Sequence, residues 1–241
     1  MAAARMRHLG FQPRQDQRYD VDMDIRHRAS PNFGPRTGQD APHLIVIHHT
    51  AMESAEAAIE RLCDPGPEVS AHYVIGDEGC VWQLVDEADR AWHAGRSCWR
   101  GLSDVNSASV GIELANPAGL AAFPPFGAAQ MAALETLLRQ VMARWDIGAS
   151  AVLGHSDVAP GRKADPGPKF DWARLARGGL AAARPDGRSG GDFCGDLARY
   201  GYDVSDEGAV LAAFRLRWRP EAIGAPLDET DRQIAAGLAA L

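Results

Sequence analysis

The sequence contains no run of apolar residues that approaches the ~20 needed to cross a membrane. It also lacks an excess of positive charge, since 25 Lys and Arg face 32 Asp and Glu, for a formal net charge of -7. Nucleic acid is therefore not an expected partner, because phosphate binding usually needs a basic surface. The N-terminal stretch MAAARMRHLGFQPRQDQRYD starts basic but continues without the apolar segment of a signal peptide. As the sequence is written, we expect a cytoplasmic protein.

Cysteine is scarce, and its spacing excludes the common cysteine-rich zinc knuckles. There are 4 cysteines, and no two of them form a C-x-x-C pair. We interpret them as buried or idle thiols, while the sequence leaves a disulfide open. The four are Cys63, Cys80, Cys98 and Cys194.

Length and composition predict a soluble globular protein with two parts. The chain has 241 residues, of which 46% are hydrophobic, so a sizeable core forms without disulfides or association, and we expect a monomer. The segment 181–191 (AAARPDGRSGG) has the composition of a linker. We predict an irregular arm at 1–40, a main domain at 41–180 and a small domain of three helices at 192–241.

Apolar periodicity predicts an α/β fold with a central mixed β-sheet flanked by helices on both faces. Strands are expected in the β-branched runs at 43–49 and 107–116 and in the run 151–155 that ends at His155. The segment 71–86 holds two more, around the turn Asp77-Glu78-Gly79. Helices are expected at 53–62, 127–145 and 170–176.

Three candidate metal ligands follow strands of this sheet. His48 ends one buried run, His155 ends another, and Asp165 lies ten positions later in a loop rich in Pro and Gly. A rigid sheet aims side chains from its loop edge, and two imidazoles with one carboxylate are a typical set for hydrolytic zinc, which keeps a further position for water. A histidine considered alone is more often structural than a ligand, and the grouping of three candidates adds modest support for a metal site.

Two further residues offer the chemistry that a zinc hydrolase needs. Glu113 interrupts the apolar run Val110–Leu114, and a charged residue in a buried strand is costly without a role or a partner. It is the candidate general base, the alternative being a strand-end glutamate that faces solvent. Lys163, two residues before Asp165, is the candidate cation for a developing oxyanion, the alternative being a solvated loop lysine.

Five strings of the sequence resemble the zinc-dependent type 2 N-acetylmuramoyl-L-alanine amidases, a family that includes the peptidoglycan recognition proteins. They are IVIHHTA, SAHYVIGDEGCVWQLV, AWHAG, SVGIELAN and VLGHSDVAPGRKADPGPKFDW, and they cover about residues 40–177. The resemblance implies that His48, His155 and Asp165 hold Zn²⁺, that Glu113 is the catalytic acid and base, and that Lys163 stabilises the oxyanion. The domain at 41–180 would be the catalytic domain.

The same resemblance implies a substrate groove. Trp92 and His93 match a pair of residues that line it, and His72 matches a histidine that is either structural or substrate-lining. Trp99 is a further aromatic candidate for the groove wall, or is packed against the core. His49 falls at a variable neighbouring position and points the other way in an extended strand.

The segment 192–241 resembles a peptidoglycan-binding helical module through LARYGYDVSDEGAVLAAFRLRWRP. The combination is similar to bacterial envelope amidases that accept intact and 1,6-anhydro muropeptides, which makes the periplasm or outer membrane the alternative location. The expected activity is cleavage of the amide between N-acetylmuramic acid and L-alanine in cell-wall turnover or recycling. Two alternatives are a non-catalytic peptidoglycan-binding protein of the same fold and a zinc hydrolase of another amide.

Overall fold

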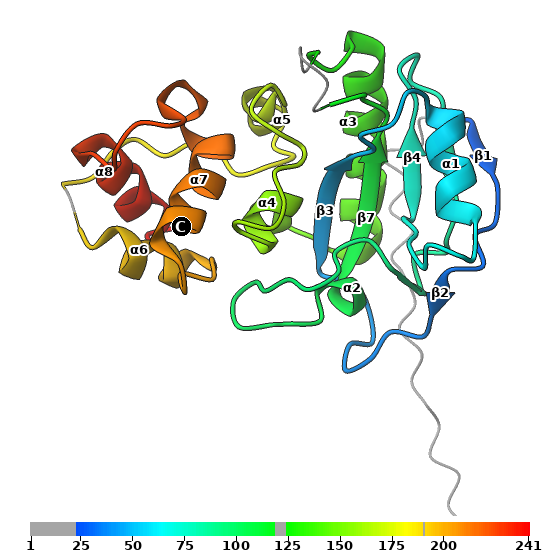
Figure 1. Ribbon diagram of the computed structural model, residues 1–241, viewed down its shortest axis with the longest axis horizontal. Coiled ribbons are helices and arrows are strands. Elements are labelled where there is room, and N and C mark those ends of the chain that lie inside the picture. Colours follow the sequence, from blue (N-terminus) through cyan, green and yellow to red (C-terminus); the bar gives the residue numbers. More distant parts are fainter. Residues whose placement is uncertain (1–22, 119–123, 190) are drawn as a thin grey trace, which may run out of the picture.

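The computed structural model describes residues 23–118, 124–189 and 191–241, and a six-stranded mixed sheet forms its centre (Figure 1). The strand order is β1-β5-β4-β7-β3-β8, and every neighbouring pair is parallel except β4 and β5. The strands are β1 (Ile25–His27), β3 (Leu44–His49), β4 (Tyr73–Ile75), β5 (Val81–Gln83), β7 (Ser109–Leu114) and β8 (Val152–Gly154). The predicted α/β class with a mixed sheet is confirmed.

The described helices are α1 (Ala55–Cys63), α2 (Val105–Ala108), α3 (Ala128–Trp145), α4 (His155–Val158), α5 (Trp172–Arg177), α6 (Phe193–Tyr200), α7 (Glu207–Trp218) and α8 (Glu229–Leu238). Helices α1, α2 and α3 lie between strands along the chain, and the remaining helices follow the last strand, β8. Side-chain oxygens cap the N-termini of several of these helices, because a free N–H group in the first turn needs an acceptor. Ser54 accepts from Ala57 N–H at α1, and Asp206 accepts from Ala209 N–H at α7.

The two-residue period of the strands divides the core between the two faces of the sheet. On one face, Ile45 and Ile47 of β3 pack in the cluster that α3 covers. On the other face, Leu44 and Val46 pack in a cluster with the C-terminal helices, while α1 packs in a third cluster with Val74 of β4. His48 continues the series of Leu44 and Val46, so it lies on this second face.

The three C-terminal helices α6, α7 and α8, called here the C-terminal module, pack against the rest of the chain rather than apart from it. Their apolar residues share one cluster with Val46 of β3 and Leu153 of β8. In Figure 1 α4 and α5 lie between the sheet and this module. The division into domains at 41–180 and 192–241, with a linker at 181–191, stays a prediction.

Two local expectations differ from the structure. The N-terminal arm predicted to be irregular at 1–40 contains β1 and the short β2 (Phe33–Gly34), which pairs with β6 (Arg90–Ala91); residues 1–22 lie outside the described residues. These edge strands are largely exposed and therefore show no apolar period. The predicted strand that ends at His155 stops at Gly154, and His155 is the first residue of α4.

Among the residues described, no helix combines the length and apolarity of a membrane span.

Candidate metal centre

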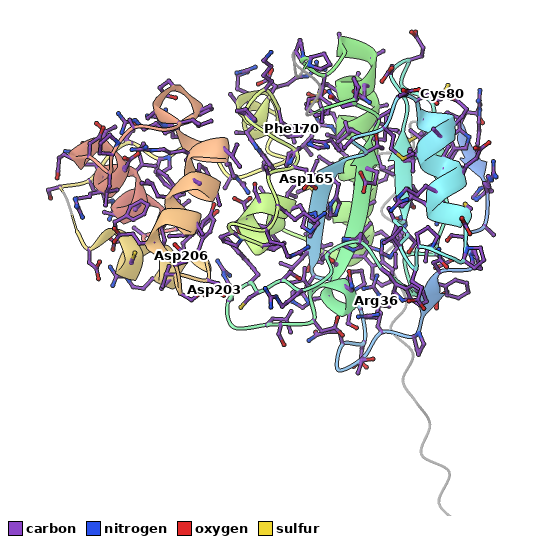
Figure 2. All side chains as sticks on the ribbon, viewed as in Figure 1. Arg36, Cys80, Asp165, Phe170, Asp203 and Asp206 are labelled. Carbon is purple, nitrogen blue, oxygen red and sulfur yellow. The ribbon has the colours of Figure 1, made fainter. Side chains whose placement is uncertain are left out.

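Three side chains predicted as ligands converge on one point of the second sheet face. His48 Nδ1 lies 2.9 Å from His155 Nδ1 and 3.0 Å from Asp165 Oδ2, and His155 Nδ1 lies 2.9 Å from the same carboxylate oxygen. His48 comes from β3, His155 from α4 and Asp165 from the loop after α4, and all three are buried. In Figure 2 the Asp165 side chain lies beside β3, between the sheet and the C-terminal module.

The electrostatics of this triangle suit a cation. Burial, and after it the neighbouring His155, lower the pKa of His48 to about 4, so its imidazole is neutral at neutral pH. Burial alone would raise the pKa of Asp165, but hydrogen bonds with His155 and His48 hold it well below its usual range. The site therefore presents an ionised carboxylate and a neutral imidazole lone pair to the same point.

The segment after β6 contacts the Nε2 atoms of His48 and His155, on the side of each ring opposite to Nδ1. The Ala94 carbonyl accepts a hydrogen bond from His155 Nε2 at 3.1 Å, and His93 Nδ1 lies 3.0 Å from His48 Nε2. Asn106 holds this segment, because its Oδ1 accepts from the backbone N–H groups of His93 and Ala94. These contacts leave each Nδ1 directed at the metal position, as partners behind a ligand usually do.

The contacts of His48 and His93 determine which ring nitrogen of each imidazole carries the hydrogen. If His48 Nδ1 binds a metal, its Nε2 carries the hydrogen and donates to His93 Nδ1. His93 Nε2 then donates to Ser109 Oγ at 3.2 Å, and the Ser109 hydroxyl donates to the Val105 carbonyl at 2.6 Å. This series of hydrogen bonds ends at a backbone carbonyl, which only accepts. One tautomer of each imidazole therefore satisfies every contact in the series.

A glycine makes room for this chain of contacts. A Cβ at Gly111 would lie 2.4 Å from the His93 ring, so any side chain at this position of β7 would displace His93. Gly154 has a similar role at the end of β8, where a Cβ would lie 2.9 Å from Pro166, next to the ligand Asp165. The two glycines allow close approach of the supporting segments.

Glu113 is placed beside the metal ligands by sheet register. Its Cα pairs with that of His48 across the parallel strands β7 and β3, so the two side chains lie on the same face. Its Oε2 is buried and accepts no hydrogen bond from the residues that the structure describes. Burial, then the charge of Asp165, raise the pKa of Glu113 to about 8, and Lys163 acts in the opposite direction. A carboxyl with such a pKa is suited to exchange protons near neutral pH.

A cavity of about 260 Å³ opens onto these residues. Its lining includes the three candidate metal ligands and also Glu113 and Lys163. Residues of α1 and of the loop before β4 also line it. Lys163 is exposed at this cavity, and its charge contributes to the low pKa of His48. The residues predicted to carry chemistry thus surround one space that is open to solvent.

The predicted groove residues do not all reach this cavity. Trp92 and His93 line it. His72 does not line it and has no exposed surface, and its ring is held by Gly111 N–H at Nδ1 and by the Asp89 carbonyl at Nε2. Trp99 is also away from it, 2% exposed and packed against tyrosines of the C-terminal module. The sequence left His72 and Trp99 open between a groove position and a structural one, and these contacts favour the structural position for both.

Three supporting residues were not identified from the sequence: Ala94, Asn106 and Ser109. Ala94 acts through its backbone carbonyl, which any residue supplies, so its identity carries no signal. Asn106 lies in α2 and Ser109 is the first residue of β7, and only their polar character next to a buried apolar run distinguishes them.

Known proteins resemble both the sequence and this architecture. The family model Amidase_2, described as N-acetylmuramoyl-L-alanine amidase, matches residues 38–168. The N-acetylmuramoyl-L-alanine amidase AmiD of Escherichia coli (strain K12) is 36% identical over 249 residues, which span 90% of this chain and 87% of AmiD. The 1,6-anhydro-N-acetylmuramyl-L-alanine amidase AmpD of the same strain is 34% identical over 170 residues, which span 64% of this chain and 91% of AmpD.

Solved structures agree with these matches. AmiD from E. coli, in complex with the substrate anhydro-N-acetylmuramic acid-L-Ala-D-gamma-Glu-L-Lys, has a TM-score of 0.73 at 35% identity, covering 88% of this chain and 91% of AmiD. AmpDh3 from Pseudomonas aeruginosa, in complex with anhydromuramic pentapeptide, has a TM-score of 0.73 at 31% identity, covering 89% of this chain and 94% of AmpDh3. Both alignments extend well beyond the residues that the family model matches.

Proposed function

This chain belongs to the Amidase_2 family of N-acetylmuramoyl-L-alanine amidases, and on that basis we propose that it hydrolyses the amide between N-acetylmuramic acid and L-alanine in muropeptides. The sugar is intact or 1,6-anhydro, and the reaction serves cell-wall turnover or recycling. The observation that carries the proposal is the convergence of His48, His155 and Asp165 beside Glu113, whose Oε2 is buried, in one open cavity. The anhydromuramyl peptides bound to AmiD and AmpDh3 support this class of substrate.

We propose that the metal is Zn²⁺, held by His48, His155 and Asp165. The donor set fits, because zinc binds imidazole nitrogen and carboxylate oxygen at about 2.0–2.2 Å, and three atoms about 3 Å apart share a point at that distance. Bound zinc would polarise the substrate carbonyl and lower the pKa of a coordinated water to about 7.

Glu113 and Lys163 at the cavity supply proton transfer and stabilisation of the oxyanion. Glu113 takes a proton from the attacking water, whose oxygen bonds to the lactoyl carbonyl carbon. The Lys163 ammonium stabilises the negative charge that develops on the carbonyl oxygen. Glu113 then returns the proton to the alanine nitrogen as the carbon–nitrogen bond breaks. The products are the muramic acid carboxylate and a peptide with a free N-terminal alanine.

Incubation of the zinc-loaded chain with a purified anhydromuramyl tripeptide, followed by mass spectrometry, tests the function. We expect release of anhydro-N-acetylmuramic acid and of the intact peptide. Zinc binding without any product would identify a binding protein of the same fold. Cleavage at a different amide would identify a hydrolase with another substrate.

Lys163→Met is expected to lower kcat/KM by about 10²–10³, the usual effect of removing one oxyanion-stabilising group. Because Lys163 lowers the pKa of Glu113, the variant should also shift the acid limb of the pH–rate profile to higher pH. The exposed Lys169 follows in the same loop region outside the cavity, so Lys169→Met is the matched control. Equal rates for both variants and the unmodified protein would contradict the role of Lys163.

His93→Ala is expected to weaken zinc binding by about 10–100-fold, because His48 Nε2 would lose the acceptor that holds its ring. A competition titration with a chelator measures the change in Kd. The exposed His43→Ala is the control, with unchanged affinity expected. An unchanged Kd in His93→Ala would show that His48 keeps its orientation without this partner.

A further inference from the structure

Asp157 is a carboxylate without exposed surface, two residues after the ligand His155. Its Oδ2 accepts hydrogen bonds from Gly154 N–H at 2.8 Å and from Arg217 Nη1 at 2.6 Å. Its Oδ1 accepts from the Tyr202 hydroxyl at 2.5 Å. Arg217 and Tyr202 both belong to the C-terminal part of the chain. Because a buried polar group is costly without partners, the Asp157 carboxyl group depends on that part for its hydrogen bonds.

The Arg217 side chain is committed to this contact. It is 1% exposed, and its guanidinium carbon lies 4.1 Å from the centre of the Trp172 ring and 4.4 Å from that of Trp218. Its Nε and Nη2 donate no hydrogen bond to the residues described, so Asp157 is the acceptor for this cation. Trp218 Nε1 donates to the Tyr202 hydroxyl at 2.9 Å, which holds that hydroxyl toward Asp157. The two partners of Asp157 are thus themselves fixed by indole rings.

Asp157 in turn fixes the turn that carries a metal ligand. Its bond with Gly154 N–H closes the first turn of α4, which begins at His155. The next residue, Ser156, donates its backbone N–H to the Asp165 carbonyl at 2.9 Å. One short turn therefore sets the position of His155 and contacts the backbone of Asp165, two of the three ligands.

The module also packs on the loop between these ligands. A Cβ at Gly161 would lie 2.9 Å from Ala209 Cβ on α7, so α7 lies directly against the loop that carries Lys163. The contact has no charged group, but it places the same helix that carries Arg217 along the loop.

We propose that the C-terminal module is a positioning element of the metal site, in which Arg217 and Tyr202 hold Asp157 and so preorganise His155 for metal binding. This role rests on the proposed zinc site and is additional to the peptidoglycan binding that the resemblance implies for the module. Arg217 and Tyr202 do not line the cavity, and the carboxylate that both of them hydrogen-bond is that of Asp157.

Two variants of the full-length chain test this role. Arg217→Met removes the cation but keeps an apolar side chain between the indole rings, and Tyr202→Phe removes one hydrogen bond to Asp157. Arg215→Met is the matched control: Arg215 lies two residues earlier on α7, is 2% exposed, and pairs with Asp231 inside the module. The Kd for Zn²⁺, from competition with a chelator, and the unfolding temperature of each metal-free protein are measured.

We expect Arg217→Met to weaken zinc binding by about 10–100-fold, as loss of a supporting shell does, with a smaller loss in Tyr202→Phe. Arg215→Met should lower the unfolding temperature and leave the Kd unchanged. Should Arg217→Met fail to fold, Tyr202→Phe decides by the same comparison. Equal zinc affinity in the unmodified protein and the folded variants, or an equal loss in Arg215→Met, would overturn the positioning role. An unmodified protein that binds no zinc would instead overturn the proposed zinc site.

Discussion

Glu113→Gln is expected to lower kcat/KM for anhydromuramyl peptides by about 10²–10⁴, while the zinc content stays at the level of the unmodified protein. Glutamine has nearly the same shape as glutamate, so it occupies the same position on β7 without opening a cavity. It accepts no proton from water at neutral pH, and it has none to return to the leaving nitrogen. The change therefore isolates proton transfer from packing.

Zinc content by atomic absorption and steady-state kinetics on one purified muropeptide check this expectation. The exposed Glu60→Gln on α1 is the control for loss of a single negative charge. The pH profile gives a second readout, since the acid limb of kcat/KM reports the base of the free enzyme. Burial raises the pKa of Glu113 and favours its protonated form, so the unmodified protein should lose activity as pH falls. A variant with near-normal turnover at full zinc loading would remove Glu113 from the mechanism.

The sheet and the ligand triangle could be predicted because their signals are strong and local. The apolar run 44–47 before His48 and the run around Glu113 form β3 and β7, and their pairing in register brings the two polar residues together. A polar residue that interrupts a buried strand is conspicuous, because burial without a role is costly. The hairpin predicted around Asp77-Glu78-Gly79 is confirmed by the antiparallel pairing of β4 and β5, and its turn signal is also local.

Contacts between distant segments could not be predicted in this way. Nothing in the local pattern around Arg217 shows that it pairs with Asp157, 60 positions earlier in the chain. His72 and His93 are equally polar in the sequence, yet only His93 reaches the cavity, because the side chains and backbone packed around each ring decide its direction. The sequence left open whether Trp99 lines the groove or packs against the core, because its burial against Tyr200 and Tyr202 depends on how the C-terminal helices pack on the rest of the chain.

Loss of one ligand is expected to have the largest effect. His48→Ala should abolish stoichiometric zinc binding and reduce cleavage by about three powers of ten or more, since a catalytic metal supplies several kcal/mol of transition-state stabilisation. The two remaining donors, His155 and Asp165, leave the ion with too few protein ligands for a site of three. Treatment of the unmodified protein with a chelator should have the same effect on activity, and added zinc should restore it. The unfolding temperature should fall on chelation, because an ion that binds the folded state stabilises it.

His49→Ala is the decisive comparison, because His49 is the neighbour of His48 on the same strand and also lines the cavity. The alternation of side chains along β3 excludes His49 from the triangle of ligand atoms, which contains His48, His155 and Asp165. His49→Ala should therefore retain zinc at full stoichiometry, whereas His48→Ala should not. The opposite result, with zinc retained in His48→Ala and lost in His49→Ala, would mean that β3 presents the other histidine to the metal. The pairing of His48 with Glu113 would then no longer explain the chemistry.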